Sequence, residues 1–436
     1  MLVPPAHSGA RRRLAVGALF AAAILSVACI EQPTKPTRQS PALSAFDAAS
    51  RGSTRTASVR WNELSRAFVA SHNTNGPMAS RAYALVSVAQ LAAVTAVNDD
   101  DRHHGPSGAG AGGVEHPSLQ AAIAVASSDV LRALYPDAES ARLLDSALHA
   151  DELPATDPDA RHVDVEAGEN LGSAVAQVVI ARAATDGSAA ADCPATPPTP
   201  ASQFWHDDAV PPNPQPQLPC FGKVRTWLPI EVTQFRADPP PPFGSAAFLA
   251  GLAEVRQISD TRTAEQLAVV DKWLDGNNTF TPPGHWNLIA SELIERHRLS
   301  ESDAARTLAT LNVAMMDTHV ACWDRKFTYW EIRPWQVDPL ITTPRGRPHH
   351  PASPSGHACA GGAGSGVLAG LFPGDRGPLL ALGDEEGFTT VLSGVHYRFD
   401  VADGSRIGHA IARFALDLHA NGQLLGLLTA EPPRGR

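Results

Sequence analysis

Three short segments in the C-terminal third of the chain carry basic and hydroxyl side chains whose spacing suits chemistry on an anion. The first segment, residues 323–334, contains Lys326 and Arg333, which are seven residues apart. If this segment is helical, seven residues make about two turns, so both cations project from one face. Two fixed cations on one face could grip an oxyanion, although such a pair is more often part of a solvated surface.

The second segment reads Pro354-Ser355-Gly356-His357 and opens a run of small residues that suits a helix. The start of a helix presents unpaired N–H groups and the positive end of the helix dipole. The Ser355 hydroxyl and the Gly356 N–H could therefore bind an anion while His357 donates a proton to it. The same sequence is also an ordinary turn and cap.

The third segment contains His396 and Asp400. On a helix these residues are neighbours, so the carboxylate could accept a hydrogen bond from one ring nitrogen and leave the other free as a nucleophile or ligand. A structural His–Asp pair is the alternative. A zinc site is a further alternative because His349, His350 and His357 lie close in sequence, but their spacing matches no familiar zinc motif.

The elements that must position these segments are expected to be helices, which makes the fold class all-α. Apolar residues recur at helical spacing, and the N-terminal half contains no sustained alternation of period two. The expected helices are 61–69, 79–97, 117–134, 137–148, 166–184, 245–255, 263–274, 285–297, 300–323, 355–371 and 401–418. Small residues are frequent in 355–371, so neighbouring helices could approach it closely around a small-ligand pocket.

Proline divides the chain into two helical halves. Of its 37 prolines, 14 fall between Pro194 and Pro242. This clustering predicts a Pro-rich connector at 191–245, because proline supports neither helix interiors nor central strands. The N-terminal helical half is then 59–190, and the C-terminal half, which carries the candidate anion site, is 246–425.

Residues 1–29 have the layout of a bacterial export signal, because basic residues precede an apolar run that ends at Cys29. An apolar run of about 14 residues is short for a membrane span of about 20. Leu25 to Cys29 also resembles a lipobox, in which the cysteine is lipidated. We therefore expect an exported protein, either secreted or a periplasmic or outer-membrane lipoprotein. Residues 30–58, rich in Pro, Thr, Ser and Ala, are expected to form a flexible tether.

The other four cysteines would then lie where disulfides persist. Cys193, Cys220, Cys322 and Cys359 allow three pairings. We favour Cys193 with Cys220, because this bridge would restrict a Pro-rich loop that cannot hold itself by backbone hydrogen bonds. All four cysteines could instead be small buried residues.

Composition excludes several classes of protein. Hydrophobic residues make up 43% of the chain and charged residues 18%, with a mean hydropathy of −0.13. These values argue against extended disorder and against a polytopic membrane protein. The net charge of −10 repels polyanions, so nucleic acid is not an expected partner. Any anion site must be built locally.

Together the three chemical segments resemble the signature of the superfamily that joins type 2 phosphatidic acid phosphatases to vanadium-dependent haloperoxidases. Residues 326–334 and 354–357 match that signature completely, and His396 with Asp400 matches its end. Other segments are similar to secreted bacterial vanadium-haloperoxidase-like proteins: 61–93, 166–187, 239–242, 281–287 and 317–323. The resemblance therefore spans most of the chain that follows the expected signal.

The resemblance implies an all-helical fold of bundles around a bound vanadate or phosphate. Four groups would bind the equatorial oxygens: Lys326, Arg333, Ser355 and the Gly356 N–H. His357 would be the general acid–base near the apical oxygen. His396, oriented by Asp400, would bind vanadium directly, or attack phosphorus in a phosphatase. We expect all of these side chains to converge on one pocket.

One position departs from the signature. Its second arginine should stand six residues before His396, where this chain has Thr390. Removing one of three cations from a desolvated anion site could cost on the order of a few kcal/mol of binding. Four arginines are candidates to replace it, although a helix would point Arg398 elsewhere: Arg345, Arg347, Arg398 and Arg406.

We therefore predict a vanadium-haloperoxidase-like oxidoreductase, which would use vanadate to activate hydrogen peroxide for oxidation of halide or another small nucleophile. A phosphomonoesterase that acts through a phosphohistidine at His396 is the alternative enzyme. A third interpretation, motivated by Thr390, is a degenerate member that binds phosphate or nothing. The expected partners are small molecules, with membrane contact only through an N-terminal lipid.

Overall fold

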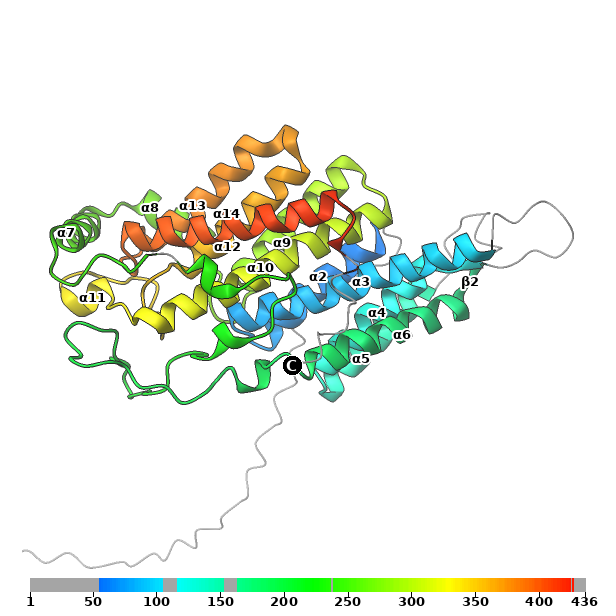
Figure 1. Cartoon of the computed structure of the whole chain (residues 1–436), viewed down its shortest axis with the longest axis horizontal. Coiled ribbons are helices and arrows are strands. Elements are labelled where there is room, and N and C mark those ends of the chain that lie inside the picture. The colour runs from blue at the N-terminus through cyan, green and yellow to red at the C-terminus, as the bar shows by residue number, and fades with distance from the viewer. Residues whose placement is uncertain (1–54, 105–115, 153–162, 237, 425, 427–436) are drawn as a thin grey trace, which may run out of the picture. The chain divides into compact units, whose positions relative to one another are not determined.

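The computed structural model describes residues 55–104, 116–152, 163–236, 238–424 and 426, which are coloured in Figure 1. The expected signal at 1–29 lies outside these residues, and so does the expected tether except for its last four positions. Helix α2 already begins at Ala57, so the last two residues of the predicted tether belong to this helix. The Thr56 side chain starts this helix by accepting a hydrogen bond from the Val59 N–H.

The described residues form an all-α fold, as predicted, with one parallel pair of two-residue strands, His116–Pro117 (β1) and Val163–Asp164 (β2). The N-terminal half contains α2 (Ala57–Ser71), α3 (Gly76–His104), α4 (Leu119–Leu134), α5 (Ala138–Glu152) and α6 (Val165–Ala183). The C-terminal half contains α7 (Ala246–Thr261), α8 (Ala264–Lys272), α9 (Thr281–His297), α10 (Glu301–Tyr329), α11 (Pro334–Val337), α12 (Gly356–Leu371), α13 (Arg376–Leu392) and α14 (Arg398–Ala420).

The helices pack in two groups that share one hydrophobic core. Helices α3, α4 and α6 contact one another in the N-terminal half, and α12 contacts α10, α13 and α14 in the C-terminal half (Figure 1). The long helices α3 and α10 join the groups, because they pack against each other. Helix α3 is long and apolar enough to span a membrane, but it is largely buried, as expected of a core helix.

Helix α12 has the close neighbours that its small residues predict. A Cβ added at Gly364 would lie 2.2 Å from the Trp286 ring of α9, and one added at Gly408 of α14 would lie 2.5 Å from the Ala363 nitrogen. Glycine therefore lets α9 and α14 approach the backbone of α12. The site-bearing start of α12 is held in a dense layer of helices, where small shifts are costly.

Helix α13 was not predicted. Gly377, Pro378 and Gly383 interrupt its apolar pattern, so the local signal is weak. The helix forms against α12, because a Cβ at Gly383 would meet the Gly361 carbonyl oxygen at 2.7 Å. Packing against α12, and not the local sequence pattern, therefore makes this segment helical.

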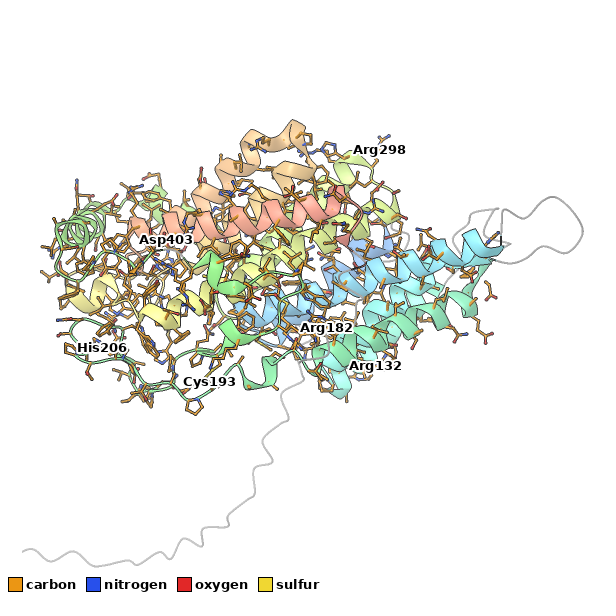
Figure 2. All side chains as sticks on the ribbon, in the orientation of Figure 1. Arg132, Arg182, Cys193, His206, Arg298 and Asp403 are labelled. Carbon is orange, nitrogen blue, oxygen red and sulfur yellow. A yellow bond between two sulfur atoms is a disulfide. The ribbon has the colours of Figure 1, made fainter. Side chains whose placement is uncertain are left out.

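The connector at 191–245 contains short 3-10 turns and no α-helix among its described residues. The predicted disulfide between Cys193 and Cys220 is present, and Cys193 is labelled in Figure 2. Farther along, the N–H groups of Trp227 and Leu228 donate to the buried Asp317 carboxylate of α10 at 2.9 and 2.7 Å. The disulfide and this carboxylate fasten a segment that has few backbone hydrogen bonds of its own.

Candidate anion site

Lys326 and Arg333 do not share one helix, so that part of the prediction is wrong. Helix α10 ends at Tyr329, because Trp330 takes the left-handed conformation with φ 53°. Arg333 stands at the N-cap of α11. Both side chains are nevertheless completely buried.

The Lys326 ammonium fastens the loop that leads into α12. Its Nζ atom donates to the carbonyl oxygens of Pro351 at 3.0 Å and Ala352 at 2.8 Å, and also to that of Pro354. These three carbonyl oxygens accept the three N–H hydrogens of the lysine ammonium. Burial lowers the pKa of Lys326 to about 8, because carbonyl dipoles do not fully replace water around the charge.

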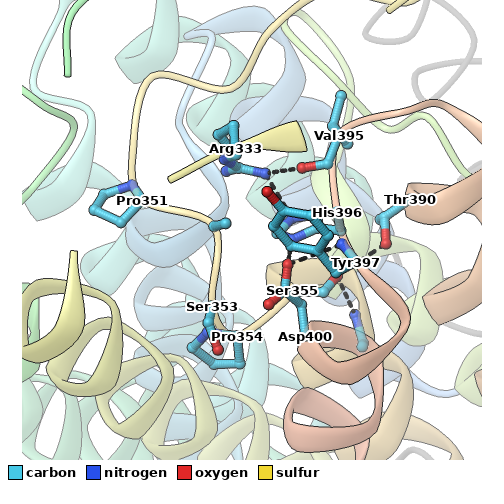
Figure 3. Close-up of polar contacts among 12 residues, drawn as sticks. Arg333, Pro351, Ser353, Pro354, Ser355, Thr390, Val395, His396, Tyr397 and Asp400 are labelled. Carbon is cyan, nitrogen blue, oxygen red and sulfur yellow. Dashed lines mark hydrogen bonds and ion pairs between the residues drawn. The ribbon is translucent and has the colours of Figure 1, made fainter. Parts of the chain in front are cut away.

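Arg333 joins two segments that are distant in sequence. Its Nη1 atom donates to the Val395 carbonyl oxygen at 2.6 Å and contacts His396 Nε2 at 2.9 Å (Figure 3). Its Nη2 atom contacts His350 Nδ1 at 3.1 Å and donates to the His350 carbonyl oxygen at 3.0 Å. Burial lowers the pKa of Arg333 to about 10, so this charge too is incompletely stabilised.

His396 precedes α14, and Asp400 lies in the first turn of that helix, so the two do not share a helix as predicted. Their predicted hydrogen bond is present, with His396 Nδ1 3.0 Å from Asp400 Oδ2. The Arg333 guanidinium can only donate, so His396 Nε2 accepts and Nδ1 carries the hydrogen. Burial and the charges of Arg333 and Lys326 hold the pKa of His396 well below its ordinary value. The ring is therefore neutral, with a lone pair on Nε2.

Helix α12 begins within the predicted anion-binding segment. Ser355 is its N-cap, and the Ser355 Oγ accepts a hydrogen bond from the Ala358 N–H at 3.3 Å. The N–H groups of Gly356 and His357 lie in the first turn, where a helix supplies no acceptor. The Ser355 N–H donates to the Asp400 carbonyl oxygen at 3.0 Å, which ties the start of α12 to α14.

His357 contacts the segment that follows α8. Its Nε2 atom lies 3.3 Å from the carbonyl oxygen of Leu274, two residues beyond the helix. A carbonyl can only accept, so Nε2 carries the hydrogen and Nδ1 is the basic atom of the neutral ring. Burial lowers the pKa of His357 below its ordinary value.

The structure brings the predicted side chains to one place. Arg333 contacts His396, and Lys326 binds the loop next to Ser355. The Lys326 charge acts on both His357 and His396. Hydrogen bonds and charge interactions therefore link these residues, while their convergence on one pocket and their roles in binding and catalysis stay predictions.

Thr390 is buried where the signature expects an arginine. Its Oγ1 donates to the Gly387 carbonyl oxygen at 2.8 Å. The same atom lies 3.2 Å from Ser355 Oγ (Figure 3). Each candidate replacement pairs with an acid elsewhere: Arg345 with Asp271, Arg347 with Asp208, Arg398 with Glu254, and Arg406 with Asp403. Lys326 and Arg333 are thus the cations that the described residues place beside His396.

Sequence reasoning missed two residues of the site. His350, considered only for zinc, contacts Arg333 and lies against Trp323 with ring centroids 5.2 Å apart. Glu331 is buried beside Asp400, where burial and the Asp400 charge raise its pKa well above the ordinary value. No local pattern marks either residue, because their roles come from loops that fold back onto α10.

The fold and the site define a helical-bundle protein with two buried cations and three histidines around the start of one helix. Residues 306–423, which contain all of these groups, match the model of the PAP2 superfamily. Over these residues the chain is similar to members of that superfamily. No curated protein matches it.

The fold is also that of bacterial vanadium haloperoxidases. A bacterial vanadium-dependent iodoperoxidase superposes with a TM-score of 0.70 at 20% identity, covering 84% of this chain and 97% of that one. An apo-type bacterial vanadium-dependent chloroperoxidase has a TM-score of 0.62 at 14% identity, covering 80% and 96%. A holo-type chloroperoxidase has a TM-score of 0.59 at 15% identity, covering 80% and 93%. At these identities the likeness concerns the fold.

Proposed function

We propose that this protein is a vanadium-haloperoxidase-like oxidoreductase, which holds vanadate at the candidate anion site and uses hydrogen peroxide to oxidise halide or another small nucleophile. The observation that carries the proposal is the state of His396. A neutral imidazole with Nδ1 fixed by Asp400 directs the lone pair of Nε2 toward a buried guanidinium. That nitrogen is suited to bind the central atom of an oxyanion whose oxygens the cations hold.

The residues present fit an oxyanion. Lys326 and Arg333 are completely buried cations with lowered pKa values, and a nearby anion would stabilise both. The Ser355 hydroxyl and the first N–H groups of α12 add neutral donors at the positive end of a helix. An entering oxyanion must take N–H donors away from main-chain carbonyls, such as that of Val395, which now accept from Arg333.

When bound, vanadate would supply Lewis-acid activation of peroxide. The chain itself would neutralise charge through Lys326 and Arg333, and Asp400 would hold His396 in the tautomer that presents Nε2. His357 would move the proton. Because its Nε2–H is committed to Leu274, Nδ1 is the atom that can accept a proton and return it.

The relatives and the disulfide support further parts of the proposal. The iodoperoxidase and chloroperoxidase structures share this fold, which favours halide as the reductant. The bridge between Cys193 and Cys220 suits an oxidising compartment, which favours the proposed export. Phosphomonoester hydrolysis through His396 would use the same residues, so the test must separate the two reactions.

The test compares the full chain with His396→Ala and with the control His297→Ala, whose imidazole is paired with Asp375 outside the site. Iodide and bromide oxidation by peroxide is measured with and without vanadate, and hydrolysis of a phosphomonoester in parallel. We expect vanadate-dependent oxidation that falls by about 100-fold or more in His396→Ala and is unchanged in His297→Ala. Hydrolysis without oxidation would favour the phosphatase. Vanadate binding without either reaction would favour a degenerate member.

A further inference from the structure

Among the described residues, two buried cysteines outside the disulfide lie on the two helices that carry the site. Cys322 belongs to α10 and Cys359 to α12, and both are completely buried. Both belong to the same hydrophobic core cluster. The turns that carry them approach closely, because a Cβ added at Gly356, one turn before Cys359, would lie 3.8 Å from the ring of Trp323, the neighbour of Cys322. Each thiol also shifts the pKa of the other.

The position of this pair relates it to the site. Cys322 lies one turn before Lys326 on α10, and Cys359 lies one turn after Ser355 on α12. The Cys359 N–H donates to the Ser355 carbonyl oxygen at 2.9 Å, so the two residues belong to the same helical turn. A covalent link between these sulfurs would constrain the two turns that present a cation and a hydroxyl to the anion.

We propose that Cys322 and Cys359 form a second disulfide, closed by hydrogen peroxide, which joins α10 to α12 and weakens oxyanion binding. An S–S bond of about 2.05 Å is much shorter than a contact between two sulfur atoms that are not bonded to each other, so closure draws the turns together. Dense packing around α12 prevents the start of the helix from absorbing that movement locally. Lys326 and Ser355 are therefore displaced relative to each other.

The chemistry balances with peroxide as the oxidant. The Cys322 sulfur attacks one peroxide oxygen and the O–O bond breaks, which gives a sulfenic acid and one water. The Cys359 sulfur then attacks the sulfenic sulfur, the S–O bond breaks, and a second water leaves. The two thiol protons end in the two waters.

The surroundings of the pair favour Cys322 as the first sulfur to react. Burial raises the pKa of the Cys322 thiol, but the neighbouring Cys359 thiol and the charges of Lys326 and Arg325 together bring it below its ordinary value. Burial raises the pKa of Cys359 well above its ordinary value. The Cys322 sulfur is thus the one prepared to attack peroxide, and the Cys359 sulfur then attacks the resulting sulfenic acid.

The disulfide is tested on the full chain by thiol titration in denaturant and by mass spectrometry of unreduced peptides. Peroxide should remove the thiols of Cys322 and Cys359 and yield a peptide pair that links these two residues. Neither change should occur in Cys322→Ser, while the double variant Cys193→Ser/Cys220→Ser should still form the link. Retention of both thiols, or their conversion to sulfinic acid without a linked peptide, would overturn the proposal.

The effect on the site is measured with inorganic phosphate by titration calorimetry before and after peroxide treatment. We expect about tenfold weaker binding after treatment, because displacement of about 1 Å strongly affects a positioned site. Cys322→Ser, which keeps the other disulfide, should show no change. A linked protein that binds phosphate with unchanged affinity would contradict the coupling. Reduced protein that binds no phosphate would contradict the anion site itself, and the linked peptide would still decide the disulfide.

Discussion

The Arg333 guanidinium donates to the Nε2 atom of His396 at 2.9 Å, across 63 positions of sequence. A cation therefore contacts the lone pair that the proposed function assigns to the central atom of an oxyanion. Since Asp400 fixes the other ring nitrogen, the ring cannot turn away without breaking a buried hydrogen bond. Anion binding must exchange the Arg333–His396 contact for contacts between each residue and the anion.

Thr390→Arg should strengthen oxyanion binding. The Thr390 hydroxyl lies 3.2 Å from Ser355 Oγ, so a guanidinium introduced there would be the third cation beside the anion. A hydrogen bond to a charged group contributes about 1.5–3 kcal/mol, so the affinity for vanadate or phosphate should rise by about tenfold or more. Titration calorimetry measures the change directly.

The control for this variant is Thr328→Arg, because Thr328 is exposed on the same helix as Lys326. It adds the same charge outside the site and should change affinity by less than about twofold. Equal gains in both variants would mean that the net charge of the protein, and not the site, limits binding.

Oxyanion affinity should fall as pH rises above about 8. Burial lowers the pKa of Lys326 to about 8 from an ordinary value of 10.5, so the unliganded site loses this cation within that interval. Phosphate binding measured from about pH 7.5 to about pH 9.5 should show the loss, because phosphate stays mainly a dianion throughout. Lys326→Arg should bind with little pH dependence over this range, since a guanidinium stays charged. An identical pH profile in the variant would assign the titration to another group.

The lowered pKa of Lys326 also affects the stability of the fold. This contribution to stability rises with pH, whereas anion affinity falls. Between the folded value of about 8 and the unfolded value of 10.5, the unfolded chain binds more protons at this lysine than the folded chain does. The penalty for burying the charged Lys326 is therefore full below about pH 8 and is relieved as pH rises toward 10.5. This contribution to stability increases with pH while anion affinity decreases, so the two measurements distinguish binding from folding.

The helical periodicity of the sequence predicted most of the fold, because amphipathic segments such as α9 and α14 bury one face. It failed at α13, where Gly377, Pro378 and Gly383 weaken the local signal and contact with α12 decides the outcome. The Cys193–Cys220 pairing was predictable because a Pro-rich segment needs an external constraint.

The types of the site residues were predictable, but their geometry was not. A helical reading of 326–333 placed both cations on one face, whereas the chain turns at Trp330 and reaches the same place by a loop. Glu331 and His350 enter the site only because that loop and the one before Ser355 pair, with the Ala352 N–H donating to the Glu331 carbonyl oxygen. Contacts between loops leave no periodic pattern in the sequence, so periodicity cannot predict them.

Gly364→Ala should destabilise the protein by about 1–3 kcal/mol, because overpacking forces side chains or backbone to shift. A Cβ at this position would lie 2.2 Å from the Trp286 ring, which is itself held by a hydrogen bond to Glu386. The control Gly377→Ala places a methyl group on α13 with no atom within 4 Å and should stabilise by up to about 1 kcal/mol. Urea denaturation gives both values, and equal stability of the two variants would refute the close contact.

Asp400→Asn should remove the constraint that keeps the ring hydrogen of His396 on Nδ1. In the parent, Asp400 Oδ2 accepts from His396 Nδ1, and burial keeps the pKa of His396 well below its ordinary value. Nitrogen-15 spectra should therefore show a neutral ring with its hydrogen on Nδ1 even where an ordinary histidine would be protonated, identified by the loss of its signals in His396→Gln. An asparagine can present an N–H to the ring, which would place the hydrogen on Nε2, facing Arg333. We expect mixed tautomers in the variant and halide oxidation reduced by about 100-fold or more. Unchanged spectra with reduced activity would show that Asp400 acts by charge, and unchanged activity would remove His396 orientation from the mechanism.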